Sequence, residues 1–483
     1  MPFFMLLIYI LPMYRLISNI VSEKESKARE SMKMMGLVDF SYWLSWWVYY
    51  FIIVTIISGL CIGVLSINAI KYSNRGLVFL FFELYGLSLF GLAVFLQSFF
   101  SRARVAAVAG TLIYFGTSFI NVVVQDPSVA RGPKTLASLL TTIAISRGCN
   151  NLGQFEVSGV GLQMDNMQLQ FENYSMATCF IVMVISLFLF FGIGLWFDNI
   201  LPSAYGLRKS CCFCCLPSYW CGRGRRSERL AKKGSRNAID AENPDDETYF
   251  EAKYMDRKNY EPVSKDLVKL EAENKVLKVQ DLRKTFENGF KAVNGINVKM
   301  YNGQIFALLG HNGAGKTTTI SMLTGLITST SGSAEVFGTD IFEDMSTIRQ
   351  FLGVCPQHDI LFDLLTPEEH LEIFCDFKGV PRAEQPEQIK KMLIDVDVYH
   401  HKDTVAENLS GGSKRKLSVA IALIGGSKLV LLDEPTSGMD LSARRKLWNM
   451  LKNYKQNRII ILTTHYMDEA DILGDRIGIM TGG

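Results

Sequence analysis

The sequence predicts two fold classes joined in one chain, a multi-pass α-helical membrane domain and an α/β P-loop NTPase domain. Three observations lead to this prediction. Five apolar runs lie near the N-terminus, a phosphate-binding loop occupies Gly310–Thr318, and a Ser-Gly-Gly turn precedes an apolar strand that ends in Asp433-Glu434. A chain of 483 residues is long enough for two or three domains. We expect a membrane domain at 1–205, a cytoplasmic linker at 206–270 and a nucleotide-binding domain at 271–483.

The membrane domain is predicted from segments long enough to cross the hydrocarbon core of a bilayer, which takes about 20 apolar residues per helix. The sequence contains five of them: Pro2–Ile20, Tyr42–Ser66, Leu77–Phe100, Val105–Val124 and Met176–Trp196. A buried helix of a soluble protein explains one such run but not five. We therefore expect a multi-pass integral protein of the plasma membrane or of an intracellular vesicle membrane.

The orientation of these spans follows from the basic residues between them, because lysine and arginine collect on the cytoplasmic side. They follow the first span, separate the third from the fourth and follow the fifth, at Lys24–Lys33, at Arg102 and Arg104, and at Arg208 and Lys209. The N-terminus is thus expected outside, and the nucleotide-binding domain in the cytoplasm. In that topology Asn173, in the sequon Asn173-Tyr174-Ser175, lies in an outer loop and is a glycosylation candidate. The sequon at Asn408 lies in the cytoplasm and is not.

Three features of the membrane part have simple expected roles. Glu83 is a carboxylate well inside a span, about two turns from its outer end, where water and headgroups reach. We expect an interfacial position for it, and a substrate contact is the alternative. Residues 21–35 are charged and amphipathic, typical of a helix on the cytoplasmic surface. The moderately apolar residues 135–145 are a candidate for a hairpin that enters the membrane without crossing it.

The linker contains a cysteine cluster and two charged runs. For the cysteines, inert thiols, S-palmitoylation and a weaker zinc site remain open. They are Cys211, Cys212, Cys214, Cys215 and Cys221. The basic run at 223–236 fits either anionic lipid headgroups or a solvated linker, and an acidic run follows at 240–251. The net charge of +3 is too small to indicate nucleic acid as a partner.

The phosphate-binding loop has the pattern G-x-x-x-x-G-K-T between an expected strand, Gln304–Leu309, and an expected helix, Gly315–Leu326. Its glycines allow backbone N–H groups to wrap phosphates, and the helix N-terminus favours their negative charge. Lys316 is expected on the β- and γ-phosphates of ATP and Thr317 on Mg²⁺. The ATP-binding candidates of the loop are Gly310, His311, Asn312, Gly313, Ala314, Gly315, Lys316, Thr317 and Thr318.

The hydrolytic candidates follow expected buried strands. Lys428–Leu432 is a continuous apolar run that places Asp433 at a metal ion and Glu434, the candidate base, at an attacking water. Arg458–Thr464 is a second buried strand, and His465 after it is expected to contact the γ-phosphate and to position Glu434. Gln357, about forty residues past Lys316, is expected to reach Mg²⁺. Phe286 is the candidate for stacking on adenine, with Phe290 as its competitor.

The order of these loops and of the Ser-Gly-Gly turn resembles the ABC transporters. Several segments are similar in amino-acid sequence to the N-terminal half of the A subfamily. They are Glu23–Glu25, Met32–Leu37, Phe99–Ala103, Gly310–Leu326, Met345–Arg349 and Leu409–Asp440. The resemblance implies membrane helices of the type V exporter class and ATP-driven movement of phospholipids or sterols. It also implies that residues 23–36 belong to the region that couples the nucleotide-binding domain to the spans.

In this architecture the signature turn binds the γ-phosphate of nucleotide held by a second, facing domain. The signature residues here are Leu409, Ser410, Gly411, Gly412 and Ser413. The implied partner is a second ABC half, in the same polypeptide or in a homodimer. The family has six spans per half with a large extracellular domain between the first two, whereas this sequence starts at the position of the second span and stops at Gly483. A fragment or incomplete gene model is the expectation, and a short half-transporter that dimerises is the alternative.

The leading hypothesis from the sequence is a lipid-translocating ATPase that uses ATP and Mg²⁺. An exporter of other cargo is one rival, and stimulation of the ATPase by lipids would separate the two. A regulator or channel subunit that uses nucleotide only as a switch is another. Glu434 and His465 argue against that second rival, because a switch does not need hydrolytic residues.

Overall fold

A computed structural model of the chain describes residues 2–124, 126, 129–201, 261, 263–286, 288–342 and 344–483. The chain divides into two compact units, one of residues 1–27 with 38–203 and one of residues 28–37 with 204–483. The cysteine cluster, Arg208, Lys209 and the charged runs at 223–236 and 240–251 lie outside the described residues.

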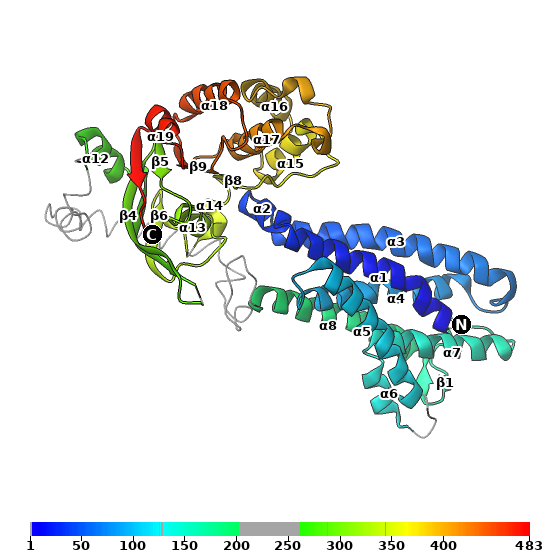
Figure 1. The fold of residues 1–483 in the computed structure, drawn as a ribbon. Helices are drawn as coiled ribbons and strands as arrows, with labels where there is room; N and C mark the ends of the chain where they lie inside the picture. Colours follow the sequence, from blue (N-terminus) through cyan, green and yellow to red (C-terminus); the bar gives the residue numbers. More distant parts are fainter. Residues whose placement is uncertain are drawn as a thin grey trace. The chain divides into compact units, whose positions relative to one another are not determined.

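In the part of the first unit that the structure describes, five helices are long and apolar enough to cross a membrane. They are α1 (Pro2–Glu25), α3 (Asp39–Asn68), α4 (Arg75–Gln97), α5 (Ala103–Val124) and α8 (Met176–Ile200), and they lie side by side in Figure 1. Within this bundle α4 is the central helix, because it packs against α1, α3, α5 and α8 and most of its apolar stretch is buried. The prediction of a multi-pass helical membrane domain is confirmed.

The segment expected as a membrane hairpin folds into two helices, α6 (Arg131–Ala137) and α7 (Thr141–Val157). The second of these packs against α5 and α8, and its residues Thr141–Cys149 are buried. Two short strands follow, β1 (Gln170–Phe171) and β2 (Tyr174–Ser175), joined by a tight turn. Both turn residues have positive φ, and the second is the exposed Asn173 at φ 62°.

Glu83 is buried inside the helix bundle, and its expected depth at the membrane interface stays a prediction. Its side chain is only 6% exposed, and Oε1 accepts a hydrogen bond from Thr55 of α3 at 3.0 Å. Neighbouring polar groups are buried with it: the hydroxyls of Tyr9 (α1) and Ser58 (α3) are 3.1 Å apart. Sequence position along a helix does not tell on which face Glu83 lies, and this face points into the bundle.

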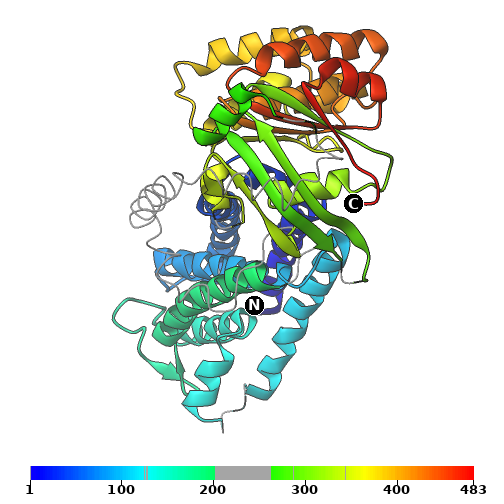
Figure 2. The ribbon, with the colours of Figure 1, turned by 90° about the vertical axis from the view of Figure 1, so that its left-hand side faces the viewer.

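The second unit is built on two sheets. The larger is parallel, with strand order β11-β5-β10-β9-β8, and the smaller is antiparallel, with order β4-β3-β6-β7. Figure 2 shows the long pair β3 and β4 of the smaller sheet side by side. The parallel strands are β5 (Gln304–Leu309), β8 (Leu352–Cys355), β9 (Leu429–Asp433), β10 (Ile459–Thr464) and β11 (Arg476–Ile479). The antiparallel strands are β3 (Val276–Thr285), β4 (Lys291–Tyr301), β6 (Ser331–Val336) and β7 (Thr339–Asp340).

Helices flank both sheets, and apolar side chains fill the space between them. Within the described residues of this unit, the α-helices are α2 (Ala28–Met34), α12 (Lys265–Ala272), α13 (Lys316–Leu323), α14 (Met345–Ile348), α15 (Pro367–Phe377), α16 (Gln385–Asp395), α17 (Gly411–Leu423), α18 (Leu441–Tyr454) and α19 (Met467–Leu473). Strands β9 and β10 are buried along their whole length because they lie inside the sheet. The prediction of an α/β P-loop domain is confirmed.

The short helix α2 packs within the second unit, although it lies inside the range expected for the membrane domain. It contacts β8, and Met34 and Met35 are buried in the two apolar cores of that unit. Gly36 has φ +111°, and a Cβ there would lie 2.7 Å from the carbonyl oxygen of Phe377. Residues 28–37 are therefore fitted closely to the nucleotide-binding part of the chain.

Candidate nucleotide site

The parallel register of the large sheet brings the candidate residues to one edge. Leu309 pairs with Thr464, Asp433 with Thr463, and Cys355 with Leu432. The segments that leave β5, β10, β9 and β8 therefore emerge next to one another, in that order, at the carboxyl ends of the strands. This edge of an α/β sheet is where ligands bind.

The phosphate-binding loop has a shape that depends on glycine. Gly313 and Gly315 have φ of 85° and 99°, values that side-chain-bearing residues rarely adopt. A Cβ at Gly315 would also lie 2.4 Å from the carbonyl oxygen of Ala292, and a Cβ at Gly310 would lie 2.6 Å from that of Met480. The loop is thus packed tightly against β4 and the end of β11. It leads directly into α13, so its last N–H groups lie at the start of that helix.

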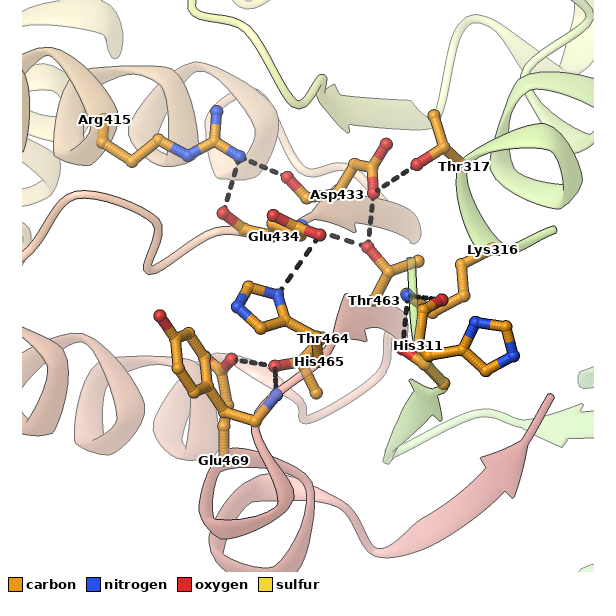
Figure 3. Close-up of polar contacts among 12 residues, drawn as sticks. His311, Lys316, Thr317, Arg415, Asp433, Glu434, Thr463, Thr464, His465 and Glu469 are labelled. Carbon is orange, nitrogen blue, oxygen red and sulfur yellow. Dashed lines mark hydrogen bonds and ion pairs between the residues drawn. The ribbon is translucent and has the colours of Figure 1, made fainter. Parts of the chain in front are cut away.

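Lys316 and Thr317 begin α13 and face the sheet edge. The Lys316 amine donates hydrogen bonds to the carbonyl oxygens of Gly310 at 2.5 Å and His311 at 3.1 Å, so it lies within the curve of the loop (Figure 3). The Thr317 hydroxyl donates to Oδ1 of Asp433 at 3.3 Å. A phosphate-binding amine and an oxygen pair suited to a divalent cation therefore lie side by side.

Asp433 ends β9 and is 3% exposed. Oδ1 accepts hydrogen bonds from the hydroxyls of both Thr317 and Thr463. Burial raises the pKa of this carboxyl above its usual range, and the two hydroxyl hydrogen bonds oppose that rise. Hard cations such as Mg²⁺ prefer carboxylate and hydroxyl oxygens as ligands, so the donor set of Asp433 and Thr317 fits that ion.

Glu434 and His465 form a pair at the same edge. The Nδ1 atom of His465 lies 3.4 Å from Oε1 of Glu434, and Figure 3 shows the imidazole pointing toward that carboxylate. The Glu434 side chain is 14% exposed and that of His465 is 37% exposed, so both remain open to a ligand. The arrangement is suited to a carboxylate that polarises a water molecule and an imidazole that orients the carboxylate.

Gln357 and Phe286 lie on exposed loops. Gln357 is two residues beyond the end of β8, at the edge that carries Asp433, and it is exposed. Phe286 follows β3 and is 40% exposed, and the Lys284 amine lies 5.4 Å from its ring centre. The backbone N–H of Phe286 donates to the carbonyl of Phe290, whose ring is 57% exposed. Both aromatic rings are therefore accessible in one hairpin loop, and the choice between them stays a prediction.

The signature residues form the start of α17. Ser410 is the N-cap, and its hydroxyl accepts a hydrogen bond from the Ser413 N–H at 3.2 Å. Leu409 is buried in an apolar core, whereas Gly411 has no atom within 4 Å of the position that a Cβ would occupy. The start of the helix is therefore open around Gly411, and a helix N-terminus of this kind suits an anion.

Two residues that the sequence analysis did not single out also contact this site. Thr463 donates to Asp433, and both its hydroxyl and its carbonyl oxygen accept from the N–H of Glu434. Arg415 contacts the carbonyl oxygens of Asp433 and Glu434 from α17 (Figure 3). Helical periodicity was an available signal for Arg415, because it shares a helix face with Ser418 and Val419, which are buried.

A buried histidine connects the loop after β8 to α15. His370 is fully buried; its Nδ1 faces the Thr366 carbonyl oxygen at 2.8 Å, and its Nε2 accepts from the Phe362 N–H at 2.9 Å. These partners fix the neutral tautomer that is protonated on Nδ1. Burial lowers the pKa of His370 below its usual value of about 6.5. Protonation of Nε2 would break its bond to Phe362.

We predict that acid destabilises this unit through His370. The folded-state pKa lies below the unfolded-state value, so the unfolded chain binds more protons as pH falls. The contribution of His370 is complete above about pH 6.5 and is lost as pH falls toward the folded-state pKa. Melting temperature measured between about pH 7.5 and pH 5.5 should therefore fall less steeply in His370→Gln than in the wild type. Exposed His400→Gln is the matched control and should keep the wild-type slope; equal slopes in all three proteins would contradict the prediction.

Comparison with known families gives one match in each part of the chain. Residues 1–196 match the family described as ABC-2 family transporter protein. Residues 293–437 match the family described as ABC transporter, a range that contains the phosphate-binding loop, the signature turn and the Asp433-Glu434 strand end. The two matches occur in the order membrane part first, nucleotide part second.

Similar curated proteins align with the whole chain. The human phospholipid-transporting ATPase ABCA3 is 38% identical over 507 residues, which cover 100% of this chain and 28% of that protein. The human retinal-specific phospholipid-transporting ATPase ABCA4 is 36% identical, with coverage of 100% and 21%. The human ATP-binding cassette sub-family A member 2 is 34% identical, with coverage of 100% and 20%. The chain thus spans between a fifth and a third of the length of these relatives.

Proposed function

Because the chain belongs to the A subfamily of the ABC transporters, we propose that it supplies a membrane part and a nucleotide-binding part of an ATP-hydrolysing lipid transporter. The ATPase proposal rests on the pair Glu434 and His465, which lies beside Asp433. Oε1 of Glu434 and Nδ1 of His465 are 3.4 Å apart. The lipid proposal is supported by two relatives whose names describe phospholipid-transporting ATPases. In this proposal residues 1–205 are the membrane domain, 206–270 the linker and 271–483 the nucleotide-binding domain.

In the proposed reaction, the phosphate-binding loop holds the triphosphate of ATP through the N–H groups at the start of α13 and the Lys316 amine. Glu434 accepts a proton from the attacking water, and His465 orients the Glu434 carboxylate and contacts the γ-phosphate. Thr463 keeps the backbone of Glu434 at the sheet edge. Phe286 stacks on the adenine ring from its exposed loop.

We propose Thr317, Asp433 and Gln357 as the residues that hold Mg²⁺ with the nucleotide. Bound Mg²⁺ would neutralise charge on the phosphate oxygens during transfer. The hydroxyl of Thr317 and the carboxylate of Asp433 already converge, at 3.3 Å. Gln357 lies on the adjacent loop, and its exposed side chain is free to turn toward the same edge.

The signature turn acts on nucleotide of a second ABC half in this proposal. Its residues start α17, where a Cβ at Gly411 or Gly412 would meet no atom within 4 Å, whereas the phosphate-binding loop starts α13. Two such halves facing each other head to tail would complete two sites, each with a loop from one half and a turn from the other.

A blot with an antibody against residues 227–251 shows whether the second half is in the same polypeptide or in a second chain. A deglycosylated band several-fold above 54.3 kDa means that both halves share one polypeptide, and a band near that mass means a dimer of short chains.

The proposed orientation puts the turn between β1 and β2 outside the cell or in the vesicle lumen. We predict that Asn173 is then glycosylated, because it is exposed at the tip of this turn. Loss of a glycan-dependent mobility shift in Asn173→Gln, with no change in Asn408→Gln, is the expected result. A glycan that depends on Asn408 would reverse the orientation.

Stimulation of ATP hydrolysis by lipid tests the proposed function. The full-length protein is purified in detergent, and its ATPase rate is measured with phospholipid, with sterol and with amphiphilic drugs or peptides. A rate that rises with phospholipid or sterol supports a lipid transporter. A rate that responds to drugs or peptides and not to lipids identifies a transporter of other cargo.

A further inference from the structure

Arg415 lies in α17, between the signature turn and the apolar body of the helix. Only 2% of its surface is exposed, although arginine is usually found at the protein surface. A buried guanidinium requires acceptors for its N–H groups, since an unpaired buried charge is strongly unfavourable. The acceptors that Arg415 uses belong to two loops of the candidate nucleotide site.

The guanidinium joins the loop after β8 to the end of β9. Nη1 donates to the Pro356 carbonyl oxygen at 2.6 Å and to Oδ1 of Asp359 at 2.9 Å. Nη2 donates to the carbonyl oxygen of Glu434 at 2.9 Å and to that of Asp433. One side chain thus holds the residues on both sides of Gln357 and the backbone of the candidate base.

The backbone of Glu434 has a conformation that needs such support. Its φ is +50°, in the left-handed region that is unfavourable for residues other than glycine. Residues keep such conformations only where their surroundings fix them, and these positions cluster at active sites. The N–H of Glu434 is bound to Thr463, and its carbonyl oxygen is bound to Arg415. Both polar groups of this peptide segment are therefore fixed, one from β10 and one from α17.

The loop after β8 is fixed to the same helix by a second contact. Oδ1 of Asp359 accepts from Arg415 and also from the Ser418 hydroxyl at 2.9 Å, one turn further along α17. Ser410, at the start of α17, is only five residues from Arg415. A movement of the N-terminal end of α17, where the signature turn lies, would therefore displace the Glu434 carbonyl and the Gln357 loop together.

Resting on the function proposed above, we infer that Arg415 is a positioning residue for ATP hydrolysis. It holds the backbone of Glu434 and the loop of Gln357 in one arrangement with the helix that begins at the signature turn. Lysine cannot replace it fully, because a single ammonium group lacks the planar fork that reaches acceptors on two loops. The role is to place the base, so it affects turnover more than nucleotide affinity.

The test is a comparison of kcat and ATP affinity in the full-length protein reconstituted in lipid. Arg415→Met should lower kcat about 10²-fold, the loss expected from a displacement of about 1 Å at a reacting group. ATP affinity should stay within about two-fold of the wild type, because the phosphate-binding loop is untouched. The kcat of Arg415→Lys should lie between that of the wild type and that of Arg415→Met. If Arg415→Met does not fold, the kcat of Arg415→Lys decides the test.

A double variant and a matched control separate positioning from stability. Arg415→Met added to Glu434→Gln should lower the residual rate little further, because the base that Arg415 places is already lost. Arg458→Gln is the control, since Arg458 donates to the Leu423 carbonyl oxygen at the other end of α17. It should lower the melting temperature and leave kcat near the wild-type value.

Each outcome has a defined meaning. Three results would overturn the positioning role alone. They are a wild-type kcat in Arg415→Met, a loss of ATP affinity as large as the loss of kcat, and a kcat loss in the double variant equal to the product of the losses in the two single variants. A wild-type protein without ATPase activity that depends on Glu434 overturns the proposed function, and the inference with it.

Discussion

Glu434→Gln should nearly abolish ATP hydrolysis while ATP binding is preserved. The substitution keeps the size of the side chain and an oxygen atom that faces His465. In the wild type, Nδ1 of His465 lies 3.4 Å from Oε1 of Glu434. An amide cannot accept the proton of the attacking water, so the contribution of general base catalysis is lost, about 10²–10⁴-fold in kcat. The phosphate-binding loop and Lys316 do not change, so the Kd for ATP should not change either.

The measurement is kcat and ATP Kd for the full-length protein. Glu387→Gln, an exposed residue of α16, is the matched control for removal of one carboxylate and should behave as the wild type. Hydrolysis in Glu434→Gln within a few-fold of the wild-type rate would show that another group is the base. Loss of ATP binding would instead assign Glu434 to the binding of nucleotide.

Gly411→Asp should stop turnover without harming the fold. Gly411 is the first residue of α17, and an added Cβ meets no atom within 4 Å, so the backbone has room for a substitution. An aspartate in the first turn of a helix stabilises it, by about 0.3–1 kcal/mol. The same charge repels a γ-phosphate bound at that helix end. Two unit charges about 4 Å apart at an effective dielectric constant of about 20 repel by about 4 kcal/mol. That energy corresponds to a loss of about 10³-fold in turnover.

This result would separate the two surfaces of the proposed composite site. ATP affinity at the phosphate-binding loop of the variant chain should remain, because the loop begins α13 and not α17. Gly411→Ala carries no charge and should keep turnover within about two-fold of the wild type. Turnover in Gly411→Asp equal to that of Gly411→Ala would exclude the signature turn from the γ-phosphate site.

Much of this architecture was predictable from local patterns. The five membrane helices begin and end within a few residues of the apolar runs, since hydrocarbon thickness sets their length. The strands β9 and β10 were predictable as continuous apolar runs ending in functional residues, because parallel strands inside a sheet are buried on both faces. The candidate residues were expected after these strands, but their meeting at one sheet edge follows from the register of β5, β10, β9 and β8.

Other features depend on contacts between segments far apart in sequence. The burial of Glu83 depends on the helices that surround it, which hydropathy along one helix does not contain. The grouping of residues 28–37 with the second unit depends on how Met34 and Met35 pack with its two cores. Three of the acceptors of Arg415 are backbone carbonyl oxygens, which are present in every residue and leave no mark in the sequence.

ATP-dependent movement of phospholipid is the direct test of whether this chain belongs to a lipid-translocating ATPase. The full-length protein is reconstituted in vesicles that contain a fluorescent phospholipid, and the label that is accessible from each leaflet is followed with and without ATP and Mg²⁺. We expect that the wild type moves lipid between leaflets, or out of the membrane, only when ATP is hydrolysed, and that Glu434→Gln moves none. Wild-type protein that hydrolyses ATP at its full lipid-stimulated rate and still moves no phospholipid or sterol would show that the chain is not part of a lipid transporter.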